Sequence, residues 1–377
     1  MNNGFLGENI PKLGFGLMRL PMNDKEIDME QTKRMVDTFM AKGFTYFDSA
    51  YVYIGGKSEV AMKEAIVDRY PRESFQLASK LPLWDINTWE EMEKVFNESL
   101  ERAGTDYFDF YLLHAMDKER FEKAEKMGAW DFIRKMKEEG KIKHTGFSFH
   151  DSAEVLDEAL AKHKDDTEFV QLQINYIDWE SDSVQSRKCY EVTRKYDIPV
   201  IVMEPVKGGS LVNLPEEAEA AFKAVNPELS IPSWAVRYCA SMEGIITVLS
   251  GMSNEEQLND NVSYMENFKP LNEEEMKAVE KAVEVINSVP TIPCTKCKYC
   301  VDGCPQKINI PEIFAAVNHN KKFGAPGQKP NNMWDYNNAT KDGGKASDCI
   351  SCGACQSHCP QHIEIIDELS AAAELYE

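Results

Sequence analysis

The chain has 377 residues, 43% of them apolar, which is enough to bury the cores of two or three domains. Its formal net charge of −21 argues against nucleic acid and anionic membrane surfaces as partners, because both are negatively charged. No apolar run could span a bilayer, and the first residues lack the charged-then-apolar pattern of a signal peptide. Eight of the ten cysteines stand in cluster spacing, so we expect a protein of the reducing cytoplasm.

Short apolar strands alternate with amphipathic helices over most of the chain. Strands are predicted at 12–20, 44–48, 75–80, 108–114, 143–148, 169–173, 200–203 and 245–249. Helices are predicted at 30–42, 57–69, 88–103, 128–139, 152–163, 183–196, 232–241 and 254–264. Apolar strands that are each followed by a helix are typical of a parallel sheet. Eight such units predict an α/β fold, a (β/α)8 TIM barrel, and the lack of a G-x-G-x-x-G fingerprint after any strand argues against a Rossmann site.

The pattern changes after the last barrel unit. One more amphipathic helix is predicted at 272–288, followed by the proline-punctuated linker VPTIP. We therefore expect a barrel domain with its trailing helix at 1–289 and a second domain at 290–377. In the second domain a short helix is predicted at 311–319. The stretch 324–345, rich in Gly, Asn and Pro, is predicted to be an irregular loop.

The second domain carries two cysteine runs, CTKCKYCVDGCP and CISCGACQSHCP, which share the spacing C-x2-C-x2-C-x3-C-P. This spacing is typical of bacterial two-cluster ferredoxins, so we expect a small α+β ferredoxin domain. Three thiolates of a run surround one [4Fe–4S] cluster, and the fourth, followed by proline, reaches the other cluster. The predicted ligand sets are Cys294, Cys297, Cys300 and Cys359 for one cluster, and Cys349, Cys352, Cys355 and Cys304 for the other. Disulfides and zinc sites are the alternatives, but paired CxxC zinc sites do not require the third cysteine and the proline.

Polar side chains stand at the carboxyl ends of three neighbouring predicted strands, where barrel enzymes place their working residues. These are Asp48, Lys80 and His114, and Tyr53 follows Asp48 in the next loop. A tyrosine is a poor acid at neutral pH unless a cation stabilises its phenolate. Lys80 can supply that cation, Asp48 can fix Lys80, and His114 can orient a carbonyl oxygen. Each residue alone has a structural explanation, as a helix cap or a packed side chain, but their joint placement favours carbonyl reduction.

Several segments together resemble the aldo/keto reductase superfamily. They are KLGFGLMRLP, FDSAYVY, ASK at 78–80, FYLLH at 110–114, GFS at 146–148 and GMSNEEQLNDN at 251–261. The resemblance covers residues 5–265 and implies a (β/α)8 barrel that transfers hydride from a nicotinamide cofactor lying across the strand ends. With the cysteine-rich tail included, the chain resembles the subgroup of this superfamily that carries a ferredoxin domain.

By this resemblance the catalytic tetrad of the family falls on Asp48, Tyr53, Lys80 and His114. Tyr51 is the competing phenol, but the family spacing D-[ST]-A-x-x-Y selects Tyr53. The implied activity is NAD(P)H-dependent reduction of an aldehyde or ketone, with Tyr53 as the general acid.

The resemblance also implies a set of cofactor contacts. They are Gly16, Met18, Ser148, Gln173, Met203, Pro205, Lys207, Gly209, Gly251, Ser253, Gln257 and Asn261. Ser148 and Gln173 match the residues that hold the carboxamide in the family. Phe149 and His150 follow Ser148 at the point where the family has Asn, which removes one expected contact.

Two loops are expected to hold the phosphates of the cofactor. The loop 203–211, MEPVKGGSL, offers backbone N–H groups, two glycines and Lys207 to a diphosphate. Gly251 and Gln257 stand where the family often has Lys and Arg for the 2′-phosphate. The choice between NADPH and NADH therefore stays open, and we expect weak discrimination between them.

Four further residues lie outside these motifs. Cys189 and Cys239 fall within helical patterns and are expected to be small core residues. Trp84 and Trp179 follow predicted strands, where they either form an apolar substrate wall or cap the barrel core.

Two functions remain in competition. The first is a reductase of a small-molecule carbonyl compound that carries two [4Fe–4S] clusters. The second is an electron-transfer protein whose clusters serve a redox protein partner docked on the barrel. A nicotinamide gives two electrons as hydride whereas each cluster takes one electron, and no fingerprint for a flavin is present. We therefore expect that the clusters do not join the hydride step.

Overall fold

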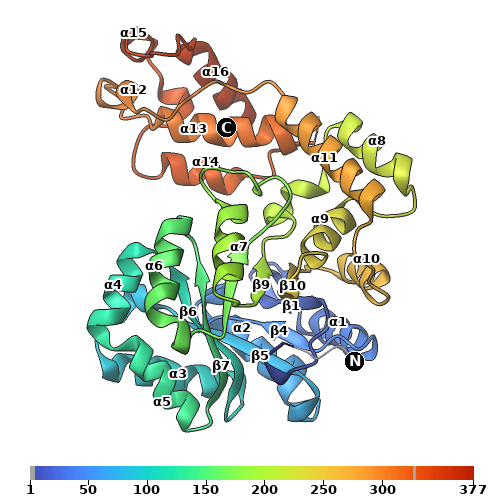
Figure 1. The fold of residues 1–377 in the computed structure, drawn as a ribbon. Coiled ribbons are helices and arrows are strands. Elements are labelled where there is room, and N and C mark those ends of the chain that lie inside the picture. Colours follow the sequence, from blue (N-terminus) through green and yellow to red (C-terminus); the bar gives the residue numbers. More distant parts are fainter. Residues whose placement is uncertain (1–4, 326–327) are drawn as a thin grey trace. The chain divides into compact units, whose positions relative to one another are not determined.

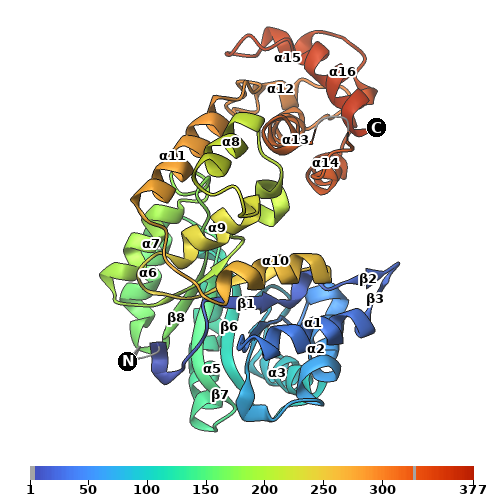
Figure 2. The same cartoon turned by 90° about the vertical axis from the view of Figure 1, so that its right-hand side faces the viewer.

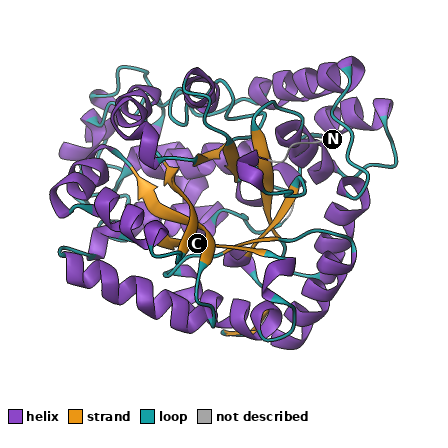
Figure 3. Ribbon diagram, turned by 60° about the horizontal axis from the view of Figure 1, so that its bottom comes forward, coloured by secondary structure: helices purple, strands orange, loops and turns teal. Residues whose placement is uncertain are grey.

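Eight parallel strands close into a barrel, which confirms the predicted fold (Figure 1). Around the barrel the order is β1-β10-β9-β8-β7-β6-β5-β4. The strands are β1 (Leu13–Gly16), β4 (Tyr46–Asp48), β5 (Gln76–Leu81), β6 (Phe108–Met116), β7 (Ile142–Phe149), β8 (Phe169–Gln173), β9 (Val200–Met203) and β10 (Ile245–Gly251). In Figure 3 they lie at the centre with helices outside them. Gly16 pairs with both Asp48 and Gly251, so three strands that carry candidate site residues end side by side.

The computed structural model describes residues 5–325 and 328–377. They form two compact units, of which the first contains the residues up to Gly208 together with Pro232–Glu273. The second contains Gly209–Ile231 and Glu274–Glu377. The helix after the barrel, α11 (Glu273–Ser288), therefore packs with the cysteine-rich tail. The functional boundary expected after residue 289 remains a prediction.

Side-chain caps define several of the barrel helices. The helices of the first unit are α1 (Met29–Ala41), α2 (Lys57–Met62), α3 (Trp89–Ala103), α4 (Lys118–Met127), α5 (Ala129–Glu138), α6 (Ala153–His163), α7 (Ser186–Lys195), α9 (Ile231–Ala240) and α10 (Glu255–Met265). A side chain accepts the N–H three residues ahead at Asp28, Thr88, Asp117, Ser152 and Asn254. Such caps satisfy N–H groups that have no partner within the helix.

Two of the helices that precede the cysteine-rich tail were missing from the sequence prediction. In α4 the buried residues are Phe121 and Ala124, and in α8 (Glu216–Val225) they are Ala218 and Phe222. Two apolar contacts per helix are too few to produce a clear helical period. The packing of these two helices could therefore not be recognised from their sequences.

Aromatic rings fill the barrel interior. Phe110 of β6 lies 5.2 Å from Tyr46 and 5.1 Å from Phe169, measured between ring centroids. The cluster also contains Ala78, Leu112, Ile201, Ile246 and Leu249, and Leu6 and Ile10 pack against it. The interior is therefore a packed core, so the functional groups lie at the strand ends.

The second unit is built from helices around its own apolar core, shown in a second view in Figure 2. The helices of the tail are α12 (Tyr299–Asp302), α13 (Ile310–Phe323), α14 (Met333–Thr340), α15 (Ala354–Ser357) and α16 (Ile365–Tyr376). The rings of Tyr336 and Tyr376 stack with centroids 4.5 Å apart, and the Tyr376 hydroxyl donates to the Ala316 carbonyl at 2.7 Å. These contacts join α13, α14 and α16. None of the described helices has the length and apolar character needed to cross a membrane.

Two expectations for the tail need correction. The stretch 324–345, predicted to be an irregular loop, contains α14, because Tyr336 and Ala339 lie one turn apart and are both buried. The tail was expected to be α+β, but its described residues contain helices and turns and no strand. The peptide groups next to the cysteines form turns instead, as where Cys349 donates to the Ala346 carbonyl.

Candidate functional site

A buried ion pair stands at the carboxyl ends of β4 and β5. Lys80 is fully buried, and its Nζ donates to Asp48 Oδ1 at 2.5 Å and to the Ser49 carbonyl at 2.6 Å. The second Asp48 oxygen accepts from Gln171 Nε2 at 3.1 Å. Burial alone would lower the pKa of Lys80, but Asp48 and Tyr53 outweigh it and raise that pKa. Lys80 therefore carries a fixed positive charge at neutral pH.

Tyr53 faces this charge. The Lys80 Nζ lies 4.7 Å from the centroid of the Tyr53 ring. Burial raises the pKa of Tyr53, while the charge of Lys80 acts in the opposite direction, so the phenol holds its proton at neutral pH. Tyr51 is occupied elsewhere, since its hydroxyl donates to Glu98 Oε2 at 2.6 Å and its ring lies 4.1 Å from the Arg102 guanidinium. The geometry thus favours Tyr53 over Tyr51 as the acid.

His114 completes the group from the end of β6. Its ring lies 5.7 Å from that of Tyr53, and its Nδ1 is buried without a hydrogen-bond partner among the described residues. Burial, followed by the charges of Lys80 and of other basic groups, holds the pKa of His114 well below its usual range. A neutral imidazole carries one ring N–H, which can donate to a carbonyl oxygen without adding a charge.

The two tryptophans have different surroundings. Trp84 is 36% exposed, and its ring lies 5.1 Å from that of His114, so it borders the candidate site. Trp179 packs against Tyr190 at 5.6 Å and Tyr238 at 6.3 Å. Trp84 is thus positioned as a wall of the candidate site, and Trp179 as part of an aromatic cluster.

The candidate carboxamide residues lie at the ends of β7 and β8. The Ser148 Oγ accepts the N–H of Ala115 at 2.7 Å, and Gln173 Nε2 donates to Asp178 Oδ2 at 3.1 Å. On the neighbouring strand Met203 ends β9, and Pro205 is buried just beyond it. These side chains are held in place by the protein before any cofactor binds.

Lys207 is not a free cation. Its Nζ lies 2.7 and 2.8 Å from the two carboxylate oxygens of Asp178, and its backbone has a φ of +50°. The expected role of Lys207 at a diphosphate is therefore weakened, because Asp178 already balances its charge. Gly208 and Gly209 follow with positive φ, and Gly209 begins the second compact unit.

The loop after β10 is held by internal hydrogen bonds. Gln257 Oε1 accepts the N–H of Ser253 at 2.7 Å, and the Ser253 Oγ donates to the Arg19 carbonyl at 2.9 Å. Asn261 is buried and donates to Ser250 Oγ at 2.6 Å. The contacts of Ser253 and Asn261 thus hold the loop itself.

Sequence reasoning missed Arg19. It lies just after β1 in a short helical turn (Leu17–Arg19), next to the candidate residues Gly16 and Met18. Met18 is 58% exposed. The missed signal was a lone basic residue directly after a strand whose glycines allow close approach of a ligand.

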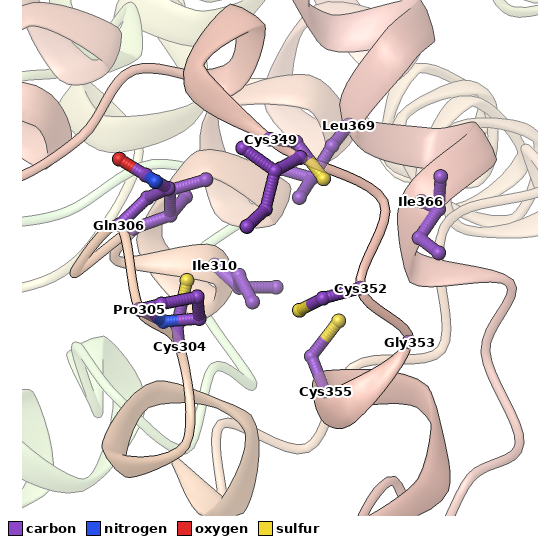
Figure 4. Close-up of a pocket in the computed structure, with 12 residues that line it drawn as sticks. Cys304, Pro305, Gln306, Ile310, Cys349, Cys352, Gly353, Cys355, Ile366 and Leu369 are labelled. Carbon is purple, nitrogen blue, oxygen red and sulfur yellow. The ribbon is translucent and has the colours of Figure 1, made fainter.

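The eight cysteines of the two runs line two cavities. Cys304, Cys349, Cys352 and Cys355 line one of them (Figure 4), and Cys294, Cys297, Cys300 and Cys359 line the other. Each cavity thus combines three cysteines of one run with the fourth cysteine of the other run. Ile310, at the start of α13, lines both cavities, and most of the other lining residues are apolar.

This donor set fits iron–sulfur clusters better than single ions. Among the described residues, no three His, Cys, Asp or Glu side chains converge closely enough to hold one metal ion. Four thiols around a wider cavity suit a polynuclear cluster. Burial raises the pKa of Cys300 to about 11 and also raises that of Cys355. Metal binding would therefore have to deprotonate these thiols.

Comparisons with known proteins identify families for both the barrel and the cysteine-rich tail. Residues 12–284 match the model of the aldo/keto reductase family, and residues 293–364 match the 4Fe-4S dicluster domain. "Uncharacterized oxidoreductase YqkF" of Bacillus subtilis is 25% identical over 72% of this chain and 92% of its own length. "9,11-endoperoxide prostaglandin H2 reductase" of Trypanosoma cruzi is 24% identical over 73% of this chain and 88% of its own length.

Solved structures show the same fold. An aldo-keto reductase from Klebsiella pneumoniae in complex with NADPH superposes with a TM-score of 0.60 at 19% identity, covering 74% of this chain and 93% of its own. The holo form of an aldo-keto reductase from Bacillus halodurans gives 0.59 at 23% identity, covering 73% and 93%. Because the family model covers most of the chain, the protein belongs to the aldo/keto reductase family and carries a C-terminal 4Fe-4S dicluster domain.

Proposed function

We propose that the protein reduces an aldehyde or ketone to the alcohol, with NADPH or NADH as the hydride donor and Tyr53 as the proton donor. The observation that carries this proposal is the buried Lys80–Asp48 pair, which faces Tyr53 at the mouth of the barrel. The relatives named as reductases and oxidoreductases support the reaction class.

The protein groups divide the chemistry between them. A nicotinamide cofactor, when bound, would supply the hydride for the carbonyl carbon. Tyr53 gives its phenolic proton to the carbonyl oxygen as negative charge develops there, and the fixed charge of Lys80 stabilises the phenolate that remains. Asp48 acts through Lys80 by keeping it charged and in place. His114 donates its N–H to the same carbonyl oxygen, and solvent returns the proton to Tyr53.

The protein offers contacts along an extended cofactor. Ser148 and Gln173 would orient the carboxamide of the nicotinamide, as implied by the family resemblance. Gly16 would allow close approach of the cofactor to the end of β1, because it has no side chain. Lys207 would contribute little attraction for phosphate while it is paired with Asp178.

We infer that the two sets of four cysteines hold two [4Fe–4S] clusters in the crossed arrangement. The composition of the two cavities supports this ligand assignment. Cys297 and Cys352 are exposed, one from each run, so each cluster would lie near the surface. This exposure favours exchange of single electrons with a redox protein partner as a second function of the tail.

A pair of tyrosine variants tests the reductase proposal. The purified holoprotein, the Tyr53→Phe variant and the Tyr51→Phe variant are mixed anaerobically with NADPH and a panel of aldehydes and ketones, and loss of nicotinamide absorbance is followed. Tyr53→Phe should lower kcat by about 10²- to 10⁴-fold while leaving NADPH affinity nearly unchanged. Tyr51→Phe should retain most activity. Equal activity of both variants would rule out Tyr53 as the acid.

A mixing experiment tests whether the clusters join the hydride step. Under anaerobic, flavin-free conditions, NADPH alone should leave the absorbance of the oxidised clusters unchanged. NADPH gives two electrons together as a hydride, whereas each cluster accepts one, so a group such as a flavin would be needed to pass electrons between them. A small one-electron donor protein should bleach the same absorbance. Rapid bleaching by NADPH alone would contradict the separation of the two functions.

A further inference from the structure

Arg19 lies between two loops of the barrel mouth. Its aliphatic stem crosses the end of β10, where a methyl group added to Gly251 would lie 3.2 Å from Arg19 Cδ and 3.3 Å from Arg19 Cβ. Its guanidinium reaches the loop after β9, where a methyl group added to Gly208 would lie 3.4 Å from Arg19 Nη2. The side chain therefore extends from one candidate phosphate loop to the other.

The charge of Arg19 is available to a ligand. Arg19 is exposed, and among the described residues no carboxylate lies within ion-pair distance of its guanidinium. Lys207 on the neighbouring loop differs, because Asp178 binds it through both oxygens. Of these two cations, Arg19 is the one that forms no salt bridge with a described residue, and the charges of both act on the carboxyl of Glu204, opposing the rise in its pKa that burial causes.

The backbone of Arg19 is held in position. The Ser253 Oγ donates to its carbonyl, which ties the turn after β1 to the loop after β10. The arginine stem also fills the space that a side chain at position 251 would need. The absence of a side chain at Gly251 thus makes room for that of Arg19. As a result, the cation beside these loops comes from the end of β1 and not from the end of β10.

We propose that the Arg19 guanidinium binds the diphosphate of the nicotinamide cofactor, where its two parallel N–H groups would engage phosphate oxygens. Two parallel N–H donors with a permanent charge match a phosphate group in geometry and in sign. The head group lies against Gly208, beside the loop proposed for the diphosphate, while the stem covers the β10 side. The proposal rests on the proposed use of a nicotinamide cofactor, and it predicts that Arg19 serves NADPH and NADH equally.

Binding measurements on three variants test this role. The holoprotein and the variants Arg19→Ala, Arg19→Lys and Arg134→Ala are titrated with NADPH, NADH and ADP. Arg134 is the matched control, an exposed arginine that pairs with Asp131 and Asp166 on the protein surface. In Arg19→Ala the Kd for all three ligands should rise about 10- to 100-fold, as expected for loss of a charged hydrogen-bond pair. Arg19→Lys should be intermediate, and Arg134→Ala should match the parent.

The outcomes separate the inference from the function on which it rests. The parental protein should prefer NADPH over NADH by less than about tenfold, since Arg19 would contact a group present in both. Weaker binding of NADPH alone in Arg19→Ala would assign Arg19 to the 2′-phosphate and overturn the diphosphate assignment. Unchanged affinity for all three ligands would remove Arg19 from the cofactor site. Failure of the parental protein to bind either nicotinamide would instead overturn the proposed reductase function.

Discussion

The barrel site and the cysteine cavities differ in what holds their functional groups in place. In the barrel, Lys80 is fixed by Asp48 and Ser49, so protein atoms alone organise the charge. In the tail, the eight cysteines of the two runs line two cavities, and each cavity takes cysteines from both runs. Protein atoms alone therefore organise the barrel site, whereas we expect the cysteine cavities of the tail to be completed by bound metal.

The largest effect is expected when a cluster ligand is removed. The parental protein, prepared anaerobically, should contain about eight iron and eight sulfide per chain. Cys355→Ala should lower iron content and increase amide hydrogen exchange in α13 and α16, because the cavities border both helices, while β5 and β6 keep their protection. Cys189→Ala, which alters a buried cysteine outside the runs, is the control. Zinc in place of iron, or unchanged exchange in the tail, would contradict the role given to the metal.

The second test breaks the preorganised barrel pair. Lys80→Met leaves Asp48 as a buried, unpaired charge, so the barrel should lose about 3–5 kcal/mol of unfolding free energy. Turnover should also fall by about 10²-fold or more, since Tyr53 loses the cation that assists it. The double variant Lys80→Met/Asp48→Asn should recover most of the stability without recovering turnover. Urea unfolding and kcat are measured on both variants, and recovery of turnover would show that Lys80 has only a structural role.

The third and smallest effect concerns pH. Burial keeps Tyr53 protonated by raising its pKa, and it keeps His114 neutral by holding its pKa well below the usual range. Neither group should change protonation between about pH 6.5 and 9, so kcat/KM for carbonyl reduction should be nearly flat there. The profile is measured with the holoprotein over the range in which its iron content is constant. A titration near neutral pH that disappears in His114→Gln would show that the imidazole is charged in the working enzyme.

His114 also links pH to stability. Its pKa is lower in the folded protein than in the unfolded chain, so the unfolded chain gains its proton first as pH falls. The resulting loss of stability begins at about pH 6.5, the unperturbed value, and grows toward lower pH. The contribution of His114 to the free energy of unfolding should therefore be most favourable at neutral pH and above.

Much of this protein could be read from its sequence. Strand β8 (Phe169–Gln173) and strand β9 (Val200–Met203) coincide with the predicted ranges, because buried parallel strands are continuous apolar runs. The cysteine spacing predicted which thiols would share a cavity, and strand-end positions predicted that Asp48, Lys80 and His114 would lie near Tyr53. The apolar runs and the cysteine spacing are properties of the local sequence, so they can be recognised without knowledge of the tertiary structure.

Only the tertiary structure decided how charges are paired. Lys207 and Asp178 are 29 residues apart in the chain, and nothing in either local sequence shows that Asp178 balances the charge of Lys207. Arg19 meets the loops after β9 and β10 only because closing the barrel brings β1 beside β10. Whether a cation is available depends on which carboxylates lie within a few ångströms, and that distance is set by the whole fold.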